Sequence, residues 1–225
     1  MKTVVITGGS DGLGKALAEK LAKDHQVIIL ARSEKALQEV ATKAGCGYVV
    51  CDVRDAKQVS KAFAEIIQKH DRIDVLINNA GVIVNGELVD TSDEDIENVI
   101  TTNTLGSIYV AKAALRHMKE QRSGLIVNVV SQAGLIARAN RSIYNASKWA
   151  LTGFTKALQQ ETAEYGVRVT GFYPGTIKTD LFTKAGIEMK GPAITTEQAV
   201  KSIEFLLSCD EDVLISELGI KHLEG

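Results

Sequence analysis

The stretch Thr3-Val4-Val5-Ile6-Thr7-Gly8-Gly9-Ser10-Asp11-Gly12-Leu13-Gly14 decides the fold of this chain. A short β-branched run leads directly into four glycines within seven residues, and a helical pattern of apolar residues then runs over Leu13–Lys23. Glycine lets the backbone N–H groups at a helix N-terminus approach a pyrophosphate closely. The glycines at 8, 12 and 14 are spaced more widely than Gly-x-Gly-x-x-Gly, yet they serve the same close approach and the same strand–helix packing. A merely flexible connection is the alternative interpretation.

The same alternation of short apolar strands and longer helical patterns continues through the 225 residues. We expect strands at Thr3–Thr7, Gln26–Ala31, Gly47–Cys51, Ile73–Asn78, Leu125–Val130, Val167–Phe172 and Asp212–Ser216. We expect helices at about Leu13–Lys23, Glu34–Lys43, Ala56–Lys69, Asp93–Gln121, Ser142–Tyr165 and Glu197–Ser208. Because the strands are near-continuous apolar runs, both faces of the sheet must be covered. The pattern predicts a single Rossmann-type, doubly wound α/β domain over residues 1–225, with a seven-stranded, mainly parallel sheet.

Several residues mark where helices begin and end. Ser92 with Asp95 and Thr195 with Gln198 have the spacing of a capping box at a helix N-terminus. Glycine is favoured just after a helix. We expect helices to stop at Gly45, Gly124 and Gly166.

Composition excludes several classes of function. The formal charge is −2, and the 26 basic and 28 acidic residues are interspersed, so we expect neither nucleic acid nor a membrane surface as a partner. The three cysteines form no Cys-x-x-Cys pair, which predicts buried, reduced thiols and a cytoplasmic protein. The four histidines are scattered, so we expect no metal site. No signal peptide or membrane-spanning stretch is expected.

Arg32 follows the second predicted strand, where dinucleotide-binding proteins choose their cofactor. A carboxylate at this position binds the ribose 2′-OH of NAD, whereas an arginine accommodates the 2′-phosphate of NADP. The sequence reads Ala31-Arg32-Ser33, without an acid, and the planar guanidinium suits a phosphate. We therefore predict NADP(H). An ordinary surface arginine before a helix capped by Ser33, or dual cofactor specificity, are the alternatives.

Tyr144 and Lys148 lie four residues apart at the start of a helical pattern, so their side chains share one face. A free tyrosine has a pKa of about 10, and an adjacent ammonium lowers that pKa toward a usable proton shuttle. A Tyr-x-x-x-Lys spacing alone is weak evidence. Ser131, however, ends the strand that precedes this helix, so the fold returns its hydroxyl to the carboxyl edge of the sheet, where α/β folds bind ligands.

With these residues the chain closely resembles the short-chain dehydrogenase/reductase family, from Thr3 through at least Thr179. The glycine-rich turn matches the family's Thr-Gly-x-x-x-Gly-x-Gly motif. Asn78-Asn79-Ala80-Gly81 matches the segment that steadies the central strand and borders the cofactor, and Asp52 matches the aspartate near the adenine. Pro174-Gly175 with Thr179 resembles the Pro-Gly-x-x-x-Thr segment beside the nicotinamide carboxamide.

The resemblance implies an oxidoreductase that transfers a hydride between the nicotinamide and a small or medium carbonyl or alcohol substrate. Asn103, Ser131, Tyr144 and Lys148 are similar to the family's catalytic tetrad. It implies that Tyr144 is general acid in reduction and general base in oxidation, that Ser131 orients the substrate oxygen, that Lys148 holds the nicotinamide ribose, and that Asn103 anchors a water in the proton relay.

The cofactor-binding residues expected from the motifs are scattered along the chain. They are Gly8, Ser10, Asp11, Gly12, Leu13, Gly14, Arg32, Asp52, Val53, Asn79, Ala80, Gly81, Tyr144, Lys148, Pro174, Gly175, Ile177 and Thr179.

Residues 176–195 form a brief substrate lid by the same resemblance. Leu181, Phe182, Ile187 and Met189 either face the pocket or merely pack a short helix. Arg138 and Arg141, between Ser131 and Tyr144, meet a substrate carboxylate or are simply solvated. The helices at Asp93–Gln121 and Ser142–Tyr165 resemble the pair that many relatives bury between subunits, so we expect a homodimer or homotetramer.

Two rival functions remain. A catalytically idle NADP-binding regulator is one, because a fold never establishes chemistry by itself. A sugar-nucleotide epimerase or dehydratase of the longer related type is the other, and the C-terminal substrate domain that it requires is not found in this sequence.

Overall fold

A computed structural model describes residues 1–189 and 191–224. Seven strands form one sheet in the order β3-β2-β1-β4-β5-β6-β7, and every neighbouring pair is parallel. The strands are β1 (Thr3–Thr7), β2 (Gln26–Ala31), β3 (Gly47–Val50), β4 (Val75–Asn78), β5 (Gly124–Val129), β6 (Val167–Pro174) and β7 (Glu217–Ile220). This order is that of a doubly wound Rossmann-type sheet, so the predicted fold class is confirmed.

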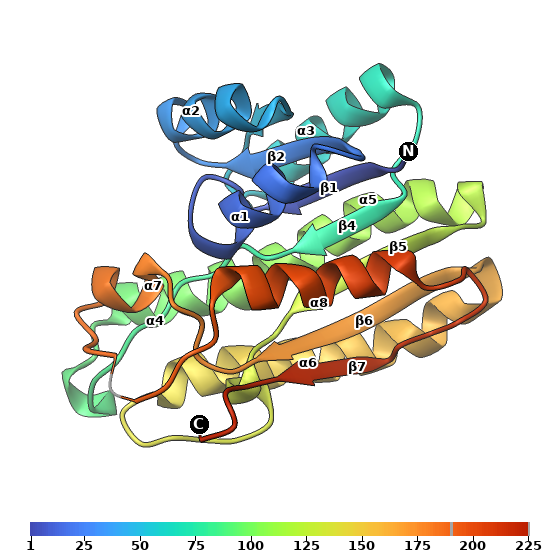
Figure 1. Cartoon of the computed structure of the whole chain (residues 1–225). Helices are drawn as coiled ribbons and strands as arrows, with labels where there is room; N and C mark the ends of the chain where they lie inside the picture. Colours follow the sequence, from blue (N-terminus) through green and yellow to red (C-terminus); the bar gives the residue numbers. More distant parts are fainter. Residues whose placement is uncertain (190, 225) are drawn as a thin grey trace.

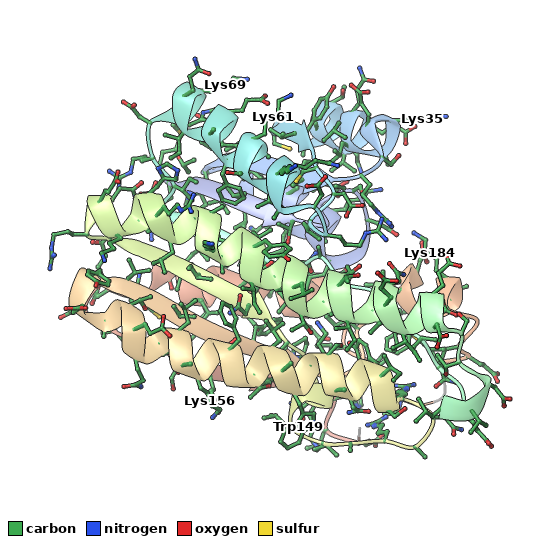
Figure 2. The ribbon with its side chains drawn as sticks, turned by 180° about the vertical axis from the view of Figure 1, so that it is seen from behind. Lys35, Lys61, Lys69, Trp149, Lys156 and Lys184 are labelled. Atoms are coloured by element: carbon green, nitrogen blue, oxygen red, sulfur yellow. The ribbon has the colours of Figure 1, made fainter. Side chains whose placement is uncertain are left out.

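Helices cover both faces of the sheet (Figure 1). On one face lie α1 (Gly12–Leu21), α2 (Glu34–Ala44) and α8 (Thr196–Ser208), which share one apolar core with the sheet. On the other face lie α3 (Ala56–His70), α5 (Ser107–Gln121) and α6 (Ser142–Thr162), which share the second core. Seen from behind, α5 and α6 run side by side along the length of the strands (Figure 2). The remaining helical segments are η1 (Leu88–Asp90), α4 (Asp93–Ile100), η2 (Thr101–Gly106), η3 (Gln132–Gly134), η4 (Ala163–Tyr165) and α7 (Asp180–Lys184).

The central strands are apolar along their whole length because each residue meets a helix layer on one face or the other. Val4, Val5 and Ile6 in β1 are completely buried, as are Leu76 and Ile77 in β4. Val4 and Ile6 belong to one core, whereas Val5 and Leu76 belong to the other. The continuous apolar runs in the sequence therefore follow from a sheet between two helix layers.

The predicted helix boundaries are mostly confirmed. Thr195 and Gln198 form a reciprocal capping box at the start of α8. The Ser92 hydroxyl caps α4 by accepting from the Asp95 backbone N–H. Gly45 ends α2 in a left-handed conformation, and Gly166 ends η4 in the same way. Gly124 was the wrong choice for α5: Arg122 takes the left-handed position, with φ 53°.

The predicted helix over Asp93–Gln121 is continuous, but it changes from α-helical to π-helical and back in the middle. Between α4 and α5, η2 is a π-helical turn. Such turns insert one residue into the i→i−4 pattern and occur often at functional sites. Side-chain hydroxyls compete for the backbone there, since Thr101 Oγ1 donates to Glu97 O at 2.6 Å and Ser107 Oγ donates to Asn103 O at 2.8 Å. Asn103 lies within this turn.

The prediction of the last strand over Asp212–Ser216 was wrong, because β7 begins at Glu217. Side chains bind several carbonyls of the predicted segment, and the β6 backbone reaches only its last residue, where Gly171 N donates to Ser216 O at 3.0 Å. Arg168 donates to the carbonyl of residue 213 at 3.1 Å, Thr170 to that of residue 215 at 2.7 Å, and Gln159 to that of Ser216 at 2.8 Å. The apolar run is therefore a connection held by side chains, and the ladder with β6 starts one residue after it.

The three cysteines are free thiols, but only Cys51 is buried, whereas Cys46 and Cys209 are partly exposed. The expectation of three buried thiols was therefore wrong for two of them. Within residues 1–189 and 191–224, no helix combines the length and apolar character that crossing a bilayer requires. The same residues contain no group of three or more His, Cys, Asp or Glu side chains able to hold a metal ion.

Candidate active site

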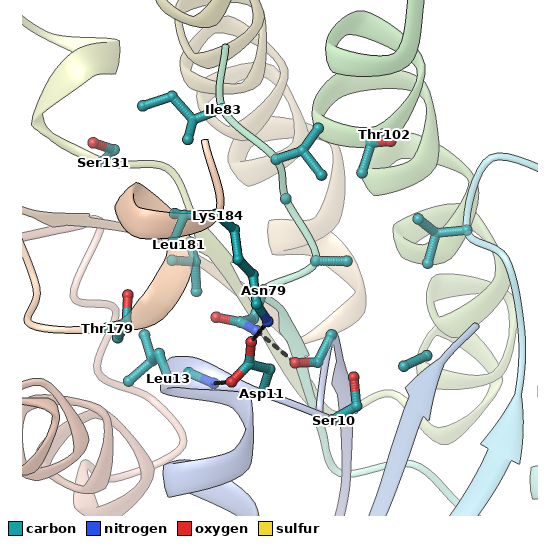
Figure 3. Close-up of a pocket in the computed structure, with 18 of the residues that line it drawn as sticks. Ser10, Asp11, Leu13, Asn79, Ile83, Thr102, Ser131, Thr179, Leu181 and Lys184 are labelled. Atoms are coloured by element: carbon teal, nitrogen blue, oxygen red, sulfur yellow. Dashed lines mark hydrogen bonds and ion pairs between the residues drawn. The ribbon is translucent and has the colours of Figure 1, made fainter. Parts of the chain in front are cut away.

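A cavity of about 910 Å³ lies along the edge of the sheet where β1, β2, β4, β5 and β6 end. Parallel strands present their carboxyl ends at one edge, so loops that are far apart in sequence meet there. Figure 3 shows Ser131, Leu181 and Thr179 around one end of this cavity and Ser10, Asp11 and Asn79 around its middle.

The structure brings almost all of the predicted site residues to this one cavity. Its lining includes Gly8, Ser10, Asp11, Gly12, Leu13, Arg32, Asp52, Val53, Asn79, Ala80, Gly81, Ser131, Tyr144, Lys148, Pro174, Gly175, Ile177 and Thr179. Gly14 and Asn103 are not among the lining residues. Both act behind the wall of the cavity, as described below.

The glycine-rich turn is built for close backbone contact. Gly8 has φ +66°, a conformation that favours glycine. A Cβ on Gly14 would lie 2.2 Å from the carbonyl oxygen of Gly8, so the first turn of α1 packs directly on the end of β1. Asp11 caps α1 by accepting from the Gly12 N–H at 2.7 Å. The turn therefore leaves room beside the N-terminus of α1 for a phosphate.

The Asn78–Asn79 pair ties the central strands together beneath the turn. Asn79 Nδ2 donates to Thr7 O at 2.9 Å, and the backbone N–H groups of Asn79 and Ala80 donate to Thr7 Oγ1 at 2.9 and 3.0 Å. Asn78 Nδ2 donates to Ser107 O at 2.8 Å and to Asn128 Oδ1 at 3.2 Å. Because all these groups are wholly or partly buried, the network fixes β1, β4 and β5 relative to α5.

Arg32 follows β2 and Asp52 lies shortly after β3, and both line the cavity. Arg32 is exposed, and its charge contributes to lowering the pKa of Asp52. The larger cause is Arg54, which donates from Nε to both Asp52 oxygens at 3.0 Å and from Nη1 to Asn98 Oδ1 at 3.1 Å. Arg54 therefore fixes the orientation of Asp52, and the sequence analysis did not identify this contact.

Ser131 has a strained backbone. Its φ of +116° and ψ of 156° belong to a region that is essentially restricted to glycine. Strain of this kind costs about 1–3 kcal/mol and persists only where the surroundings impose it, which occurs typically at functional sites. The hydroxyl accepts from the Ala133 N–H at 3.1 Å. The turn after β5 thus places Ser131 Oγ at the cavity wall beside Tyr144.

Tyr144 and Lys148 are both buried on the same face of α6, as predicted from their spacing. Lys148 Nζ lies 5.8 Å from the centre of the Tyr144 ring and donates to Val129 O at 3.0 Å. Burial is the only cause acting on the lysine, and it lowers the pKa of Lys148 to about 8.

The expected effect of the lysine on the tyrosine was wrong for this structure. The pKa of Tyr144 is raised because burial disfavours the phenolate, and the Ser131 hydroxyl and the charge of Arg141 only oppose this effect. Burial outweighs the opposing effects of Ser131 and Arg141, so the protonated phenol is the favoured form of Tyr144.

Asn103 positions the cavity wall. Its side chain accepts from Val82 N at 2.8 Å, donates to Val82 O at 2.8 Å and donates to Ser147 Oγ at 3.0 Å. Ser147 Oγ in turn donates to Tyr144 O at 2.7 Å. The π-helical turn thus links the loop after β4 to the first turn of α6 that carries Tyr144.

Asn145 has a positioning role that the sequence analysis missed. Its Nδ2 donates to Ala133 O at 2.8 Å and to Ile136 O at 3.0 Å, which fixes the loop between Ser131 and α6. Asn145 is buried. Its position between Tyr144 and Lys148 was the feature of the sequence that could have identified it.

The segment predicted to be a substrate lid is held at both ends. Lys178 N donates to Ile194 O and Ile194 N donates to Thr176 O, each at 2.9 Å, so the two ends of the lid pair with each other. Of the four apolar residues considered for the pocket, Leu181 and Phe182 line the cavity, and Ile187 and Met189 do not. Figure 3 shows Lys184 reaching from α7 to the glycine-rich turn, where its Nζ is ion-paired with Asp11 Oδ2.

The sequence analysis missed part of the lining, mostly apolar residues that pattern alone assigns to the core. They are Leu30, Ala31, Ser33, Cys51, Val82, Ile83, Asn98, Thr102, Val129, Val130, Lys184 and Ala185. Most of them are next to a predicted site residue at the end of a strand, and this position could have identified them as lining residues.

The sequence and the fold resemble those of known oxidoreductases. The family model described as "short chain dehydrogenase" matches residues 2–190. Carbonyl reductase family member 4 of Xenopus laevis is 38% identical over 182 residues, which cover 80% of this chain and 77% of that protein. Human 3-oxoacyl-[acyl-carrier-protein] reductase is 37% identical over 183 residues, with the same coverage of 80% and 77%.

A solved structure has a similar fold. The alcohol dehydrogenase of the archaeon Thermococcus sibiricus, complexed with 5-hydroxy-NADP, superposes with a TM-score of 0.88 at 27% identity. The superposition covers 99% of this chain and 97% of that one.

Proposed function

The chain belongs to the short-chain dehydrogenase family of oxidoreductases, and on that premise we propose that it interconverts a carbonyl and an alcohol with NADP(H), using Tyr144 as general acid and base. One observation carries the proposal. Ser131, Tyr144 and Lys148 lie at one end of the same cavity whose other end holds Arg32. Proton donors and a dinucleotide site thus share one space.

The cavity suits NADP(H) in its shape and its charges. The turn at Gly8, Gly12 and Gly14 brings backbone N–H groups to the N-terminus of α1, where a pyrophosphate is stabilised. Arg32 is exposed at the end of β2, and among the described residues no carboxylate is ion-paired with it. Its guanidinium is therefore free to bind a 2′-phosphate. The solved relative from Thermococcus sibiricus is complexed with a modified NADP, which supports the same choice.

In the direction of reduction, each side chain at this end of the cavity has a defined role. NADPH bound in the cavity would supply the hydride that reduces the carbonyl carbon. Tyr144 donates its phenolic proton to the carbonyl oxygen, and Ser131 Oγ stabilises the negative charge that develops on that oxygen. Because burial raises the pKa of Tyr144, the phenol is protonated before the reaction begins. Lys148 holds the nicotinamide ribose, and its pKa of about 8 lets it return a proton toward the tyrosine.

Asn103 acts as a positioning residue in this proposal. Both N–H donors of its amide are used by Val82 and Ser147, and Oδ1 accepts from Val82 N. The amide therefore has no N–H left for a relay water, which would have to donate to a carbonyl oxygen of Asn103.

The test is a turnover assay with a matched variant. The purified protein, NADPH and a panel of aldehydes and ketones should lose absorbance at the nicotinamide band. Tyr144→Phe should bind NADPH with an unchanged dissociation constant but lose at least about 100-fold in kcat, the size of a general acid's contribution. NADPH binding by the native protein without turnover of any carbonyl would identify a regulator and refute the proposal, as would retained turnover in Tyr144→Phe.

A further inference from the structure

The loop between Ser131 and α6 carries two arginines, Arg138 and Arg141, close to the cavity but outside the residues that line it. Arg141 immediately precedes α6, three residues before Tyr144, and its guanidinium carbon lies 5.6 Å above the ring centre of Phe182. Phe182 lines the cavity from the lid. Arg141 therefore lies between the start of α6 and Phe182, a residue of the cavity wall. Arg138 is near enough for its charge to act on Arg141.

Hydrogen bonds fix the backbone that carries Arg141. Asn145 holds the carbonyls of Ala133 and Ile136, and Gly86 N donates to Asn140 O at 2.9 Å. The loop is thus tied both to α6 and to the segment after β4. Arg141 Nε donates to Asn85 Oδ1 at 3.4 Å, and among the described residues no other hydrogen bond of its guanidinium is formed.

The charge of this pair is not neutralised by the protein. In residues 1–189 and 191–224, no carboxylate forms an ion pair with Arg138 or Arg141. Arg141 is partly buried, and burial together with the charge of Arg138 lowers its pKa. A partly desolvated guanidinium beside a second cation attracts an anion.

The N-terminus of α6 adds to the positive potential of Arg138 and Arg141. Its N-cap is Arg141 itself, and no side chain caps the free N–H groups, whereas side chains cap α1, α2, α3, α4 and α8. The partial positive charge of a helix N-terminus therefore acts in the same direction as the two arginines.

We infer that Arg141 recognises a carboxylate on the substrate, so that the preferred substrates are oxo acids whose carboxylate lies a few bonds from the reacting carbonyl. This inference rests on the proposed function, because Tyr144 and Ser131 define where the carbonyl oxygen binds. Three residues of helix place Arg141 about 5 Å from Tyr144 along the axis. The Phe182 ring contacts the Arg141 guanidinium, with 5.6 Å between the guanidinium carbon and the ring centre, and a guanidinium can bind one carboxylate through two N–H groups.

The test compares matched acids and esters with NADPH as reductant. The substrates are 4-oxopentanoate, 4-formylbenzoate and the methyl ester of each. The native protein should show a KM for each acid at least about tenfold below that for its ester, because a charge-assisted bidentate contact is lost in the ester. Arg141→Gln should raise the KM for the acids by about 10- to 100-fold relative to the KM for the matching esters, so that the preference for acids over esters is lost. Arg141→Lys should recover part of the loss for the acids, since it keeps the charge.

Arg116→Gln is the control, because Arg116 is an exposed arginine on α5 outside the cavity lining. It should leave the KM values for acids and esters unchanged. A second readout is thermal: pentanoate, which has no carbonyl to reduce, should raise the Tm of the native NADPH-loaded protein and not that of Arg141→Gln.

The possible failures are distinct. If the native protein reduces esters and acids with equal KM, or if Arg141→Gln changes both equally, the anion-binding role is wrong while the reductase stands. If the native protein reduces none of the four compounds nor any carbonyl of the wider panel, the proposed function itself fails. A pentanoate effect that is equal in the native protein and Arg141→Gln also overturns the inference.

Discussion

Replacing Lys148 with methionine should make the cofactor-free protein more stable while abolishing turnover. Burial lowers the pKa of Lys148 from 10.5 to about 8, which means that the folded state disfavours the ammonium. At 1.36 kcal/mol per pKa unit, the charged side chain costs the folded state about 3 kcal/mol at pH 7. Methionine has a similar length and no charge. It loses only the bond from Nζ to Val129 O, which is worth about 1 kcal/mol. A net gain of about 2 kcal/mol follows.

The pH dependence gives the sharper test. Between the folded pKa of about 8 and the unfolded value of 10.5, the unfolded chain binds a proton at this lysine that the folded chain does not. The stability of the native protein must therefore rise with pH in that window, by about 2 kcal/mol between pH 7 and pH 9.5. Lys148→Met lacks the group, so its advantage over the native protein should nearly vanish at pH 9.5.

Urea unfolding of the cofactor-free proteins at both pH values measures this effect. Lys156→Met is the matched control on the same helix. Lys156 is exposed and ion-paired with Glu217, and that carboxylate raises the pKa of Lys156 (Figure 2), so this variant should not be stabilised. If Lys148→Met is no more stable than the native protein at pH 7, or if its advantage is the same at pH 9.5, the ammonium is not desolvated and the reasoning fails.

Three further predictions concern the cofactor, the strained turn and the assembly. Arg32→Ala should raise the dissociation constant for NADPH by about 10- to 100-fold and leave that for NADH unchanged in a fluorescence titration, because only NADPH carries the 2′-phosphate; an unchanged NADPH constant would remove the basis for NADP preference. Ser131→Gly should be more stable than Ser131→Ala by about 1 kcal/mol in urea, because glycine tolerates φ +116° and alanine does not, although both lose the hydroxyl; equal stabilities would show that the turn is not strained in solution. Sedimentation velocity should show a homodimer or homotetramer for the native chain and a smaller species for Trp149→Glu, because Trp149 is 52% exposed on α6; a native monomer would exclude the assembly.

Local patterns predicted the sheet and most of the site. Each β-branched run that is buried on both faces became a strand, and the glycine-rich stretch after the first of them became the turn that lines the cavity. Helical spacing put Tyr144 and Lys148 on one face, and the chain order put Ser131 at the end of β5. These outcomes depend on backbone geometry and short-range periodicity, which can be recognised in the sequence.

Other features depended on partners that are distant in sequence. The apolar residues 213–215 became a connection because Arg168 and Thr170 bind its carbonyls, and no local pattern announces such contacts. The π-helical turn at Asn103 lies within an unbroken helical pattern, but its side chain binds Val82 and Ser147, which come from two other segments. Hydrogen bonding by distant side chains overrides local propensity in both cases.

The properties of Tyr144 also depend partly on the sequence and partly on the tertiary structure. Sequence by itself determined that Tyr144 has a lysine four residues on and a serine upstream, because identity and spacing are properties of the chain. Only the tertiary structure decided that the pKa of Tyr144 is raised and that of Lys148 lowered, because both shifts follow from burial by elements brought together in folding. The free energy of a charge depends on the medium around it, and that medium exists only once the chain has folded.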